Sequence, residues 1–261
     1  MTPDAIRSAA ERLIGARKTA TAIEALPADC VPRSLEDGHA IQDAMLDLCG
    51  WPLAGYKIGC TSALAQDMLG TDGPFPGRVF RPFLHTSPAT LAVTGLINPG
   101  VEGEFAFELN HDVPSRPTPW KRAEIEGCVG ALYPAIEIID TRFTRFADAG
   151  IPNLLADTGA NGGLVLGKAI LDWPSIDLEA AGVVMKIGGS VTGQGHGRDV
   201  LGHPLAALTW LANDLSRRGR GLMAGQIVTT GTCTGMQHVP PGRTAVADFG
   251  ALGSVSVTVS T

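Results

Sequence analysis

Residues 101–108 read Val-Glu-Gly-Glu-Phe-Ala-Phe-Glu, which is the strongest structural signal in the sequence. Alternation of this kind is typical of a β-strand, in which residues two apart share a face. Glu102, Glu104 and Glu108 would point one way and the two phenylalanines the other. If the phenylalanines enter a core, the carboxylates either form a solvated acidic face or line a site. This strand alone leaves both alternatives open.

A second run, at residues 131–140, places a carboxylate in a stretch suited to a buried strand. It reads Ala-Leu-Tyr-Pro-Ala-Ile-Glu-Ile-Ile-Asp, so Glu137 lies between isoleucines. An isolated buried carboxylate is costly and should be protonated, ion-paired or bound to a metal. Arg142 is one candidate partner, although its odd spacing puts it on the opposite face. Glu102, Glu104 and Glu137, with open positions for water and substrate, suit Mg²⁺ or Mn²⁺.

Short β-rich runs recur through the middle and C-terminal parts of the chain. The predicted strands are Val101–Leu109, Ala135–Asp140, Gly163–Val165, Val183–Ile187, Gln226–Thr230, Ala245–Phe249 and Val255–Val259. They do not alternate regularly with helices, which disfavours a doubly wound α/β sheet. We expect one domain over residues 1–261, with a mainly helical portion (1–75) and a β-rich, barrel-like or sandwich-like body (76–261).

Helix starts are marked by a capping hydroxyl, or by a proline at the first helical position, where its missing N–H costs nothing. These signals predict helices that open at Thr2-Pro3, run from Ser34 to Cys49, run from Thr61 or Ser62 to Gly70, open at Thr118-Pro119, and run from Pro204 to about Arg218. The last two interrupt the strands. His203, directly before Pro204, is expected to be a helix-entry residue, and no histidine is assigned to a metal.

The composition excludes several classes of function. Hydrophobic residues make up 44% of the 261 residues and charged residues 18%, which is ordinary for a globular protein with a core. The formal net charge of −6 argues against a nucleic-acid partner, because phosphate binding needs a basic footprint. No stretch approaches the roughly 18 apolar residues of a membrane span, and the N-terminus lacks a signal-peptide core. A cytoplasmic protein without a membrane partner is expected.

The five cysteines are odd in number and widely spaced, so neither a zinc cluster nor a disulfide framework is indicated. One of them, Cys233, lies in a Gly-Thr-Cys-Thr-Gly run at residues 231–235, which has the form of a nucleophile elbow. Such an elbow must be followed by a helix, and residues 236–242 contain two prolines that disfavour one. A cysteine nucleophile is therefore a weak alternative to metal chemistry.

Several further motifs occur in a recognisable order. They are Gly-Tyr-Lys-Ile-Gly at 55–59, the Glu102-x-Glu104 pair, Pro-Ala-Ile-Glu-Ile-Ile-Asp-Thr-Arg at 134–142, Leu-Gly-His-Pro at 201–204, Ala-Gly-Gln-Ile-Val-Thr-Thr-Gly at 224–231 and Leu-Gly-Ser-Val at 252–255. Together they resemble the 2-keto-4-pentenoate hydratase / 4-oxalocrotonate decarboxylase family, within the fumarylacetoacetate hydrolase superfamily. The similarity spans nearly the whole chain. Each motif is modest alone, and their order with the three glutamates carries the resemblance.

The resemblance implies an α+β fold built as a barrel-like mixed β-sandwich roll, a Mg²⁺ or Mn²⁺ site, a homo-oligomer and a role in the catabolism of aromatic compounds. By motif, Glu102, Glu104 and Glu137 take the metal-ligand positions. Lys57 takes the position of a general acid/base lysine, and Asp157 that of an active-site aspartate. Asp157 could instead cap a turn. Metal chelation would polarise the keto group of a small 2-oxo acid, and Lys57 could move the proton if its pKa is lowered.

One departure from the family pattern concerns residue 75. Many hydratases of the family carry Pro-Asp-(Phe/Tyr)-Gly after the third helix, whereas residues 74–77 here read Pro-Phe-Pro-Gly. Phe75 replaces the aspartate, which puts hydration in doubt without affecting the metal. The expected function is a hydratase-like, metal-dependent lyase acting on a small 2-oxo or 2-hydroxydienoate acid. A 2-oxo acid decarboxylase or C–C bond hydrolase is the alternative, and a non-catalytic 2-oxo acid binding protein a further one.

Overall fold

The computed structural model describes residues 1–261, apart from the side chains of Leu64 and Met68. Its helices are α1 (Pro3–Thr19), α2 (Leu35–Cys49), α3 (Ala63–Leu69), α4 (Arg122–Glu126), α5 (Phe146–Ala149), α6 (Ile151–Ala156) and α7 (Pro204–Arg217). The strands are β1 (Leu53–Gly59), β2 (Phe75–Phe80), β3 (Leu84–Thr86), β4 (Ala89–Ala92), β5 (Gly100–Leu109), β6 (Val129–Ile139), β7 (Asn161–Leu166), β8 (Gly182–Ile187), β9 (Ser190–His196), β10 (Ile227–Thr232), β11 (Gln237–His238), β12 (Thr244–Asp248) and β13 (Ser254–Ser260).

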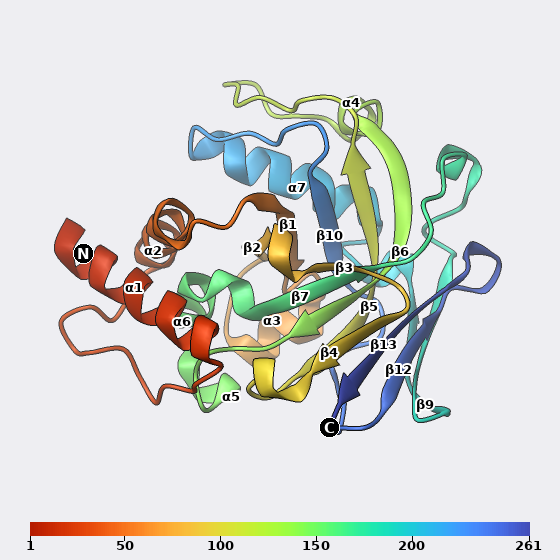
Figure 1. Cartoon of the computed structure of the whole chain (residues 1–261). Coiled ribbons are helices and arrows are strands. Elements are labelled where there is room, and N and C mark those ends of the chain that lie inside the picture. Colours follow the sequence, from red (N-terminus) through yellow and green to blue (C-terminus); the bar gives the residue numbers. More distant parts are fainter.

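The strands form two mixed sheets (Figure 1). The larger sheet has the order β2-β1-β10-β5-β6-β7-β3, with β11 paired to one end of β5, and it curls into a half-barrel. The smaller sheet has the order β4-β13-β12-β8-β9. Each sheet contains both parallel and antiparallel pairs, such as the parallel pair β1–β10 and the antiparallel pair β5–β6. The expected α+β fold, with a curled mixed sheet and helices at the N-terminus, is confirmed.

The phenylalanine face of β5 enters the main core, as the alternation predicts. Phe105 packs edge-to-face on Phe249, with ring centroids 5.3 Å apart, and Phe107 packs on Trp173 at 5.6 Å. Both phenylalanines are fully buried in a cluster that joins the two sheets to α7. The glutamate face of β5 must therefore point to the other side of the larger sheet.

Local capping signals place most of the helices correctly. The side chains of Thr2, Ser34 and Ser62 each accept a backbone N–H from the first turn of α1, α2 and α3. His203 is the helix-entry residue of α7, because its Nδ1 accepts the Leu205 N–H at 3.0 Å.

None of the described helices combines the length and the apolar character needed to cross a membrane.

The predicted helix start at Thr118-Pro119 is wrong, since α4 begins only at Arg122. The Arg116 guanidinium donates to the carbonyls of Thr118 and Pro119, at 2.9 and 3.1 Å, and lies 3.6 Å from the Trp120 ring centroid. The Trp120 N–H donates to Asn213 of α7 at 2.7 Å. These contacts satisfy the backbone groups that a helix would use, so the segment remains a loop.

Strand β1 was not among the predicted strands, yet it belongs to the larger sheet, where it lies between the edge strand β2 and β10. Its Gly55 has φ 154°, and a Cβ there would lie 1.8 Å from the Ile227 carbonyl oxygen of β10. Only glycine allows this close approach. Strand β1 therefore extends the sheet into the part of the chain that was expected to be mainly helical, and it carries Lys57.

Candidate active site

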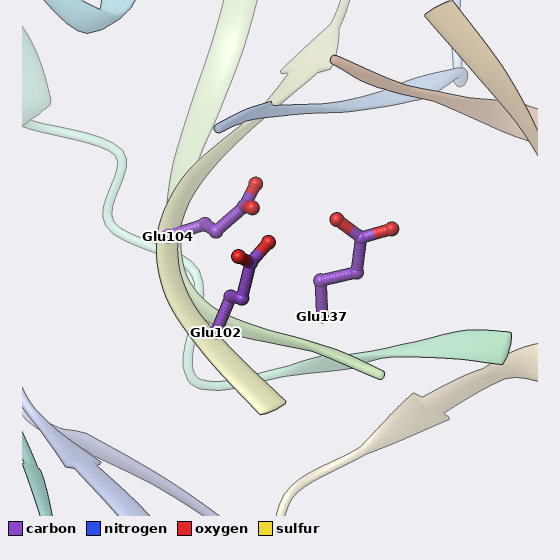
Figure 2. Close-up of side chains that lie close together, drawn as sticks. All are labelled: Glu102, Glu104 and Glu137. Atoms are coloured by element: carbon purple, nitrogen blue, oxygen red, sulfur yellow. The ribbon is translucent and has the colours of Figure 1, made fainter. Parts of the chain in front are cut away.

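The three predicted glutamates converge from two neighbouring strands. In the antiparallel pair β5–β6, Glu102 lies opposite Glu137, and Glu104 lies opposite Ala135. One carboxylate oxygen of each glutamate lies within 4.8 Å of the others, and Figure 2 shows the three side chains facing a shared space. Glu104 and Glu137 are fully buried, so the alternative of a solvated acidic face does not hold.

The donor set of this cluster fits a divalent cation. Glu104 Oε2 accepts hydrogen bonds from the Thr229 hydroxyl and from the Gly231 N–H, whereas its buried Oε1 has no hydrogen-bond partner. Glu137 Oε1 accepts from Asn161 Nδ2 at 2.9 Å, and its Oε2 makes no hydrogen bond but lies 3.2 Å from Lys57 Nζ. Each of these carboxylates thus has one oxygen fixed and one oxygen directed into the cluster. Oxygen ligands of this kind suit Mg²⁺ or Mn²⁺.

Burial and mutual repulsion make the three carboxylates costly to ionise together. Burial, followed by the charge of Glu137, raises the pKa of Glu102 to about 7. The pKa of Glu104 is raised well above its ordinary value by burial and then by the other two carboxylates. Burial also raises the pKa of Glu137, although Lys57 opposes the rise. A cation among the three carboxylates would favour their ionised forms.

Lys57 reaches this cluster from β1, which is separated from β6 by β10 and β5. In a flat sheet the two strands would lie roughly 14 Å apart, at about 4.8 Å a step. The 3.2 Å contact between Lys57 Nζ and Glu137 Oε2 therefore depends on the curl of the sheet. The structure thus pairs Glu137 with Lys57 and not with Arg142.

The carboxylates around Lys57 act against the lowered pKa that its proposed role in proton transfer requires. Burial by itself lowers the pKa of the Lys57 ammonium, but Glu137, Glu102 and Glu104 together outweigh burial, so the pKa is raised. Burial alone therefore does not meet the condition for proton transfer by Lys57, which leaves the nearby cation as the proposed cause of a lowered pKa. A divalent cation bound to the same carboxylates would oppose the rise.

Asp157 lies behind the site and does not border the cavity described below. Its Oδ1 accepts from Arg142 Nε at 2.8 Å, and its Oδ2 accepts from the Thr141 hydroxyl at 2.8 Å and the Arg142 N–H at 2.7 Å. Its side chain is 1% exposed and is fully occupied by these donors. The catalytic role expected for Asp157 stays a prediction, and these contacts favour a positioning role instead.

A left-handed turn follows Asp157 and forms part of the wall beside Lys57. Thr158, Gly159 and Ala160 have φ values of 55°, 67° and 59°, a conformation that is unusual for a β-branched threonine. The turn packs so closely on β2 that a Cβ on Gly77 would lie 2.0 Å from the Thr158 carbonyl oxygen and 3.0 Å from the Lys57 side chain. The turn leads directly into Asn161, which holds Glu137.

Sequence reasoning missed three residues that organise the site. Asn161 and Thr229 hold Glu137 and Glu104, and Arg17 of α1 holds the left-handed turn through the Thr158 hydroxyl (3.3 Å) and the Asn161 carbonyl (2.7 Å). Thr229 lies within the 224–231 motif and Asn161 lies four residues after Asp157, but neither position shows which glutamate the side chain would hold. Arg17 lies in no motif, since it occupies an ordinary position in an amphipathic helix.

Glu102 and Lys57 border a cavity of about 220 Å³. Apart from Lys57 and Glu102, its described side chains are mostly apolar, and Phe75 lies among them with its ring centroid 6.0 Å from Lys57 Nζ. Phe75 is 5% exposed. The arrangement can therefore bind a polar, chelating group at one end and an apolar group at the other.

Cys233 is not arranged as a nucleophile. Its thiol is buried, burial raises its pKa well above the ordinary value, and β10 leads into a turn and β11 without an intervening helix. The Cys233 N–H instead donates to the Gly103 carbonyl at 2.9 Å, and the Thr234 hydroxyl accepts the Gly103 N–H at 3.0 Å. This run of residues fixes β5 between two of the glutamates. All five cysteines are free thiols.

Comparison with known proteins places the chain in a family. The sequence profile described as fumarylacetoacetate hydrolase C-terminal matches residues 85–260. The 2-keto-4-pentenoate hydratase of Paraburkholderia xenovorans is 31% identical over 263 residues, covering 98% of this chain and 95% of that protein. The 2-hydroxyhexa-2,4-dienoate hydratase of Comamonas testosteroni is 33% identical over 232 residues, covering 87% of each.

A solved structure extends the similarity to the three-dimensional fold. The 4-oxalocrotonate decarboxylase of Pseudomonas putida G7, complexed with magnesium and adipate, is similar with a TM-score of 0.92 and 25% identity. The match covers 99% of this chain and 98% of that one, so it includes α1 and α2 as well as the sheets. From the profile match and the hydratases that are more than 30% identical over most of both lengths, the chain belongs to the fumarylacetoacetate hydrolase C-terminal family.

Proposed function

We propose that the protein is a divalent-metal-dependent lyase, similar to 2-keto-4-pentenoate hydratase, acting on a small 2-oxo or 2-hydroxydienoate acid. One observation carries the proposal: three carboxylates converge beside a largely apolar cavity that one of them, Glu102, lines, and the other two each keep an oxygen free of hydrogen bonds. Its hydratase relatives support the reaction class, and the magnesium complex of the similar decarboxylase supports the cofactor.

The residues that would hold the cation are Glu102, Glu104 and Glu137, with Mg²⁺ or Mn²⁺ as the proposed ion. When bound, the cation would supply Lewis-acid polarisation of the substrate's keto group and offset the charge of its carboxylate. Asn161 and Thr229 keep the glutamates oriented through their hydrogen bonds. Such supporting hydrogen bonds preserve the geometry of the ligands.

Lys57 is the proposed group that holds or moves a proton on the carbon chain of the substrate. Its Nζ lies at the boundary between the carboxylates and the apolar part of the cavity. A positioned acid or base of this kind contributes a factor of about 10² to 10⁴ to the rate. Phe75 lies beside this region, with its ring centroid 6.0 Å from Lys57 Nζ, and its side chain offers no group that could activate water.

Decarboxylation is the second candidate, and two observations favour it. The structure with a TM-score of 0.92 is that of a decarboxylase, and Phe75 removes the carboxylate that many hydratases of the family carry near the reacting carbons. C–C bond hydrolysis and non-catalytic binding of 2-oxo acids are the remaining alternatives. All four share the metal and the 2-oxo acid end.

A panel of 2-oxo acids incubated with Mg²⁺ or Mn²⁺ and followed by mass spectrometry tests the proposal. Gain of water identifies a hydratase, loss of CO₂ a decarboxylase and appearance of two fragments a hydrolase. If metal and acid bind but no substrate is converted, the protein is a binding protein and the lyase proposal is wrong.

The proposal also includes features expected from the sequence alone. These are a homo-oligomeric assembly, a cytoplasmic location and a place in the breakdown of aromatic compounds. Light scattering of the purified chain tests the first, and fractionation of cells the second. The conversion panel bears on the third through the identity of the substrate.

A further inference from the structure

We infer that this site takes acids with an apolar tail and discriminates against acids that carry a second carboxylate at the far end. The inference rests on the proposed function, because it concerns the part of the substrate opposite its 2-oxo acid end. It separates monocarboxylate from dicarboxylate substrates within the proposed class.

The first support is the distribution of charge around the cavity. Among the described side chains that line it, Lys57 is the one cation and Glu102 the one anion. Both belong to the polar end, and Lys57 is already paired with Glu137 at 3.2 Å. The described part of the lining therefore offers no basic group to neutralise a distal carboxylate.

The second support is the chemistry of the large apolar side chains that line the cavity. They include Leu69 of α3, Phe75 of β2, Phe146 of α5 and Met236 after β10, which together form an apolar wall. Phe75 is held by a buried apolar cluster that includes Ile151 and Leu155 of α6, so this wall has a packed layer behind it. Placing a carboxylate against such a wall strips its water without replacing it by a partner.

The polar groups that remain among the described lining residues are hydroxyls, the Cys60 thiol and backbone groups. Ser62 caps α3, and its hydroxyl accepts the Ala65 N–H at 3.2 Å. The Thr232 hydroxyl accepts the Thr234 N–H at 3.2 Å. These hydroxyls can donate to a polar atom of a substrate, but they carry no charge to compensate a second carboxylate. An alkyl or alkenyl tail fits the wall without that penalty.

A matched pair of acids tests the inference directly. 2-Oxohexanoate and 2-oxohexanedioate share the 2-oxo acid end and the six-carbon chain, and differ in the distal carboxylate. Calorimetry in the presence of Mg²⁺ should show at least tenfold tighter binding of the monoacid, with pyruvate as the tail-free reference. Equal or tighter binding of the diacid overturns the inference.

A substitution at the wall provides a second test. Leu69→Arg places a cation on the cavity side of α3, and it should raise the affinity for the diacid at least tenfold over the wild type. Asp67→Asn is the control, since it changes the net charge by the same amount on an exposed position of the same helix that does not line the cavity. An equal effect of both substitutions would mean that a long-range field, not the wall, sets the preference, which contradicts the inference.

The outcomes separate this inference from the proposed function. If none of the three acids binds in a Mg²⁺-dependent manner, the proposed function fails, and the inference fails with it. If pyruvate binds only with Mg²⁺ and the diacid binds at least as well as the monoacid, the inference alone fails. The wild-type comparison decides this even if Leu69→Arg does not fold.

Discussion

At the scale of single residues, Glu137 is a buried carboxylate that contacts one cation and lies beside two other carboxylates. Its Oε1 is fixed by the Asn161 amide, while its Oε2 faces the Lys57 ammonium and the other two carboxylates. Complete burial makes its negative charge costly unless cations compensate it. Lys57 supplies one positive charge for three carboxylates, so a divalent cation would bring the cluster close to electroneutrality.

Glu137→Gln should therefore weaken the binding of Mg²⁺ and Mn²⁺ and abolish turnover, while the fold is retained because glutamine keeps the volume of the side chain. Calorimetry measures the metal affinity, and circular dichroism the fold. Glu108→Gln is the matched control. Glu108 lies on the same face of β5 as Glu102 and Glu104, but it accepts a hydrogen bond from the Tyr133 hydroxyl outside the cluster. Unchanged metal affinity in Glu137→Gln would disprove the assignment of this metal ligand.

Lys57→Ala should lower turnover by about 10²-fold or more, which is the usual scale for a positioned acid or base. Metal affinity should change little and should not fall, because the substitution removes a positive charge from beside the carboxylates. Steady-state kinetics combined with metal titration distinguishes the two effects. A variant with a nearly normal kcat would reduce Lys57 to a binding or structural role.

Phe75→Asp tests whether the apolar residue limits hydration. If a carboxylate near the reacting carbons is needed to activate water, the wild type should hydrate 2-hydroxypenta-2,4-dienoate slowly, and Phe75→Asp should hydrate it faster. Loss of the ultraviolet absorbance of the dienoate follows the reaction, and Phe75→Asn controls for polarity without charge. Rapid hydration by the wild type would show that Phe75 is no obstacle.

The three glutamates could be predicted because the residues next to each of them in the sequence form a recognisable strand pattern. Glu102 and Glu104 alternate with apolar residues, and Glu137 interrupts a run of isoleucines. The residues that hold them could not be identified in this way. Arg17 and Asn161 lie 144 residues apart, and Thr229 lies 125 residues from Glu104, so their contacts exist only in the folded chain.

At the scale of elements, α1 and the left-handed turn at residues 158–160 act together. Arg17 is 8% exposed, lies 4.0 Å from the Phe83 ring centroid and donates to the backbone on the far side of the turn. The strained φ of Thr158 persists because these donors and the Arg142–Asp157 pair hold both ends of the turn. The first helix thereby helps to place Asn161 at Glu137.

Arg17→Gln should consequently weaken metal binding by several-fold and lower Tm, because the turn loses its donors and Asn161 loses its fixed position. Arg17→Lys should lose less metal affinity and less Tm than Arg17→Gln, because the lysine ammonium can still donate hydrogen bonds to the turn. Arg7→Gln in α1 is the control, as its exposed ion pair with Glu11 contributes little to stability. A fall in Tm with unchanged metal affinity would show that Arg17 is structural only.

The elements divide into those governed by local rules and those governed by distant contacts. Helices α1, α2 and α3 begin at capping side chains that act within four residues, and the sequence predicts them well. The helix start at Thr118 failed because Arg116 and Asn213 compete for the same backbone groups. Strand β1 was not predicted because glycine and lysine are not typical strand residues. The glycine at position 55 is needed only because β10 packs closely against it, which the sequence does not show.

At the scale of the whole molecule, the order of strands creates the site. Strand β10, from the C-terminal part of the chain, lies between β1 and β5, and the curled sheet turns Lys57 toward Glu137. Sequence periodicity predicts which residues share a face but does not specify this order or the curl. The family resemblance supplied the expectation of a barrel-like roll, and so of a curved sheet, but it did not supply the strand order.

The same convergence of charge makes the stability of the whole molecule depend on metal and pH together. Burial and Glu137 raise the pKa of Glu102 from 4.5 to about 7, so in the metal-free folded protein this group binds a proton more tightly than in the unfolded chain. The contribution of such a carboxyl to the free energy of unfolding is present below pH 4.5 and is lost as the pH rises from 4.5 toward 7. The metal-free protein should therefore be less stable at pH 8 than at pH 6 as far as this group is concerned.

A divalent cation should reverse that trend, because it binds the ionised carboxylates and must displace a proton at low pH. A ligand at 100 times its Kd stabilises by about 2.7 kcal/mol, and for a chain of this size each kcal/mol shifts Tm by roughly 2–4 °C. Saturating Mg²⁺ should thus raise Tm by roughly 5–10 °C at pH 8 and by less at pH 6, and a chelator should remove the effect. Thermal melts at both pH values, with Glu137→Gln as the control that should not respond, measure the difference. An equal response at pH 6 and pH 8 would mean that no proton is displaced, and that the cation binds somewhere other than the three glutamates.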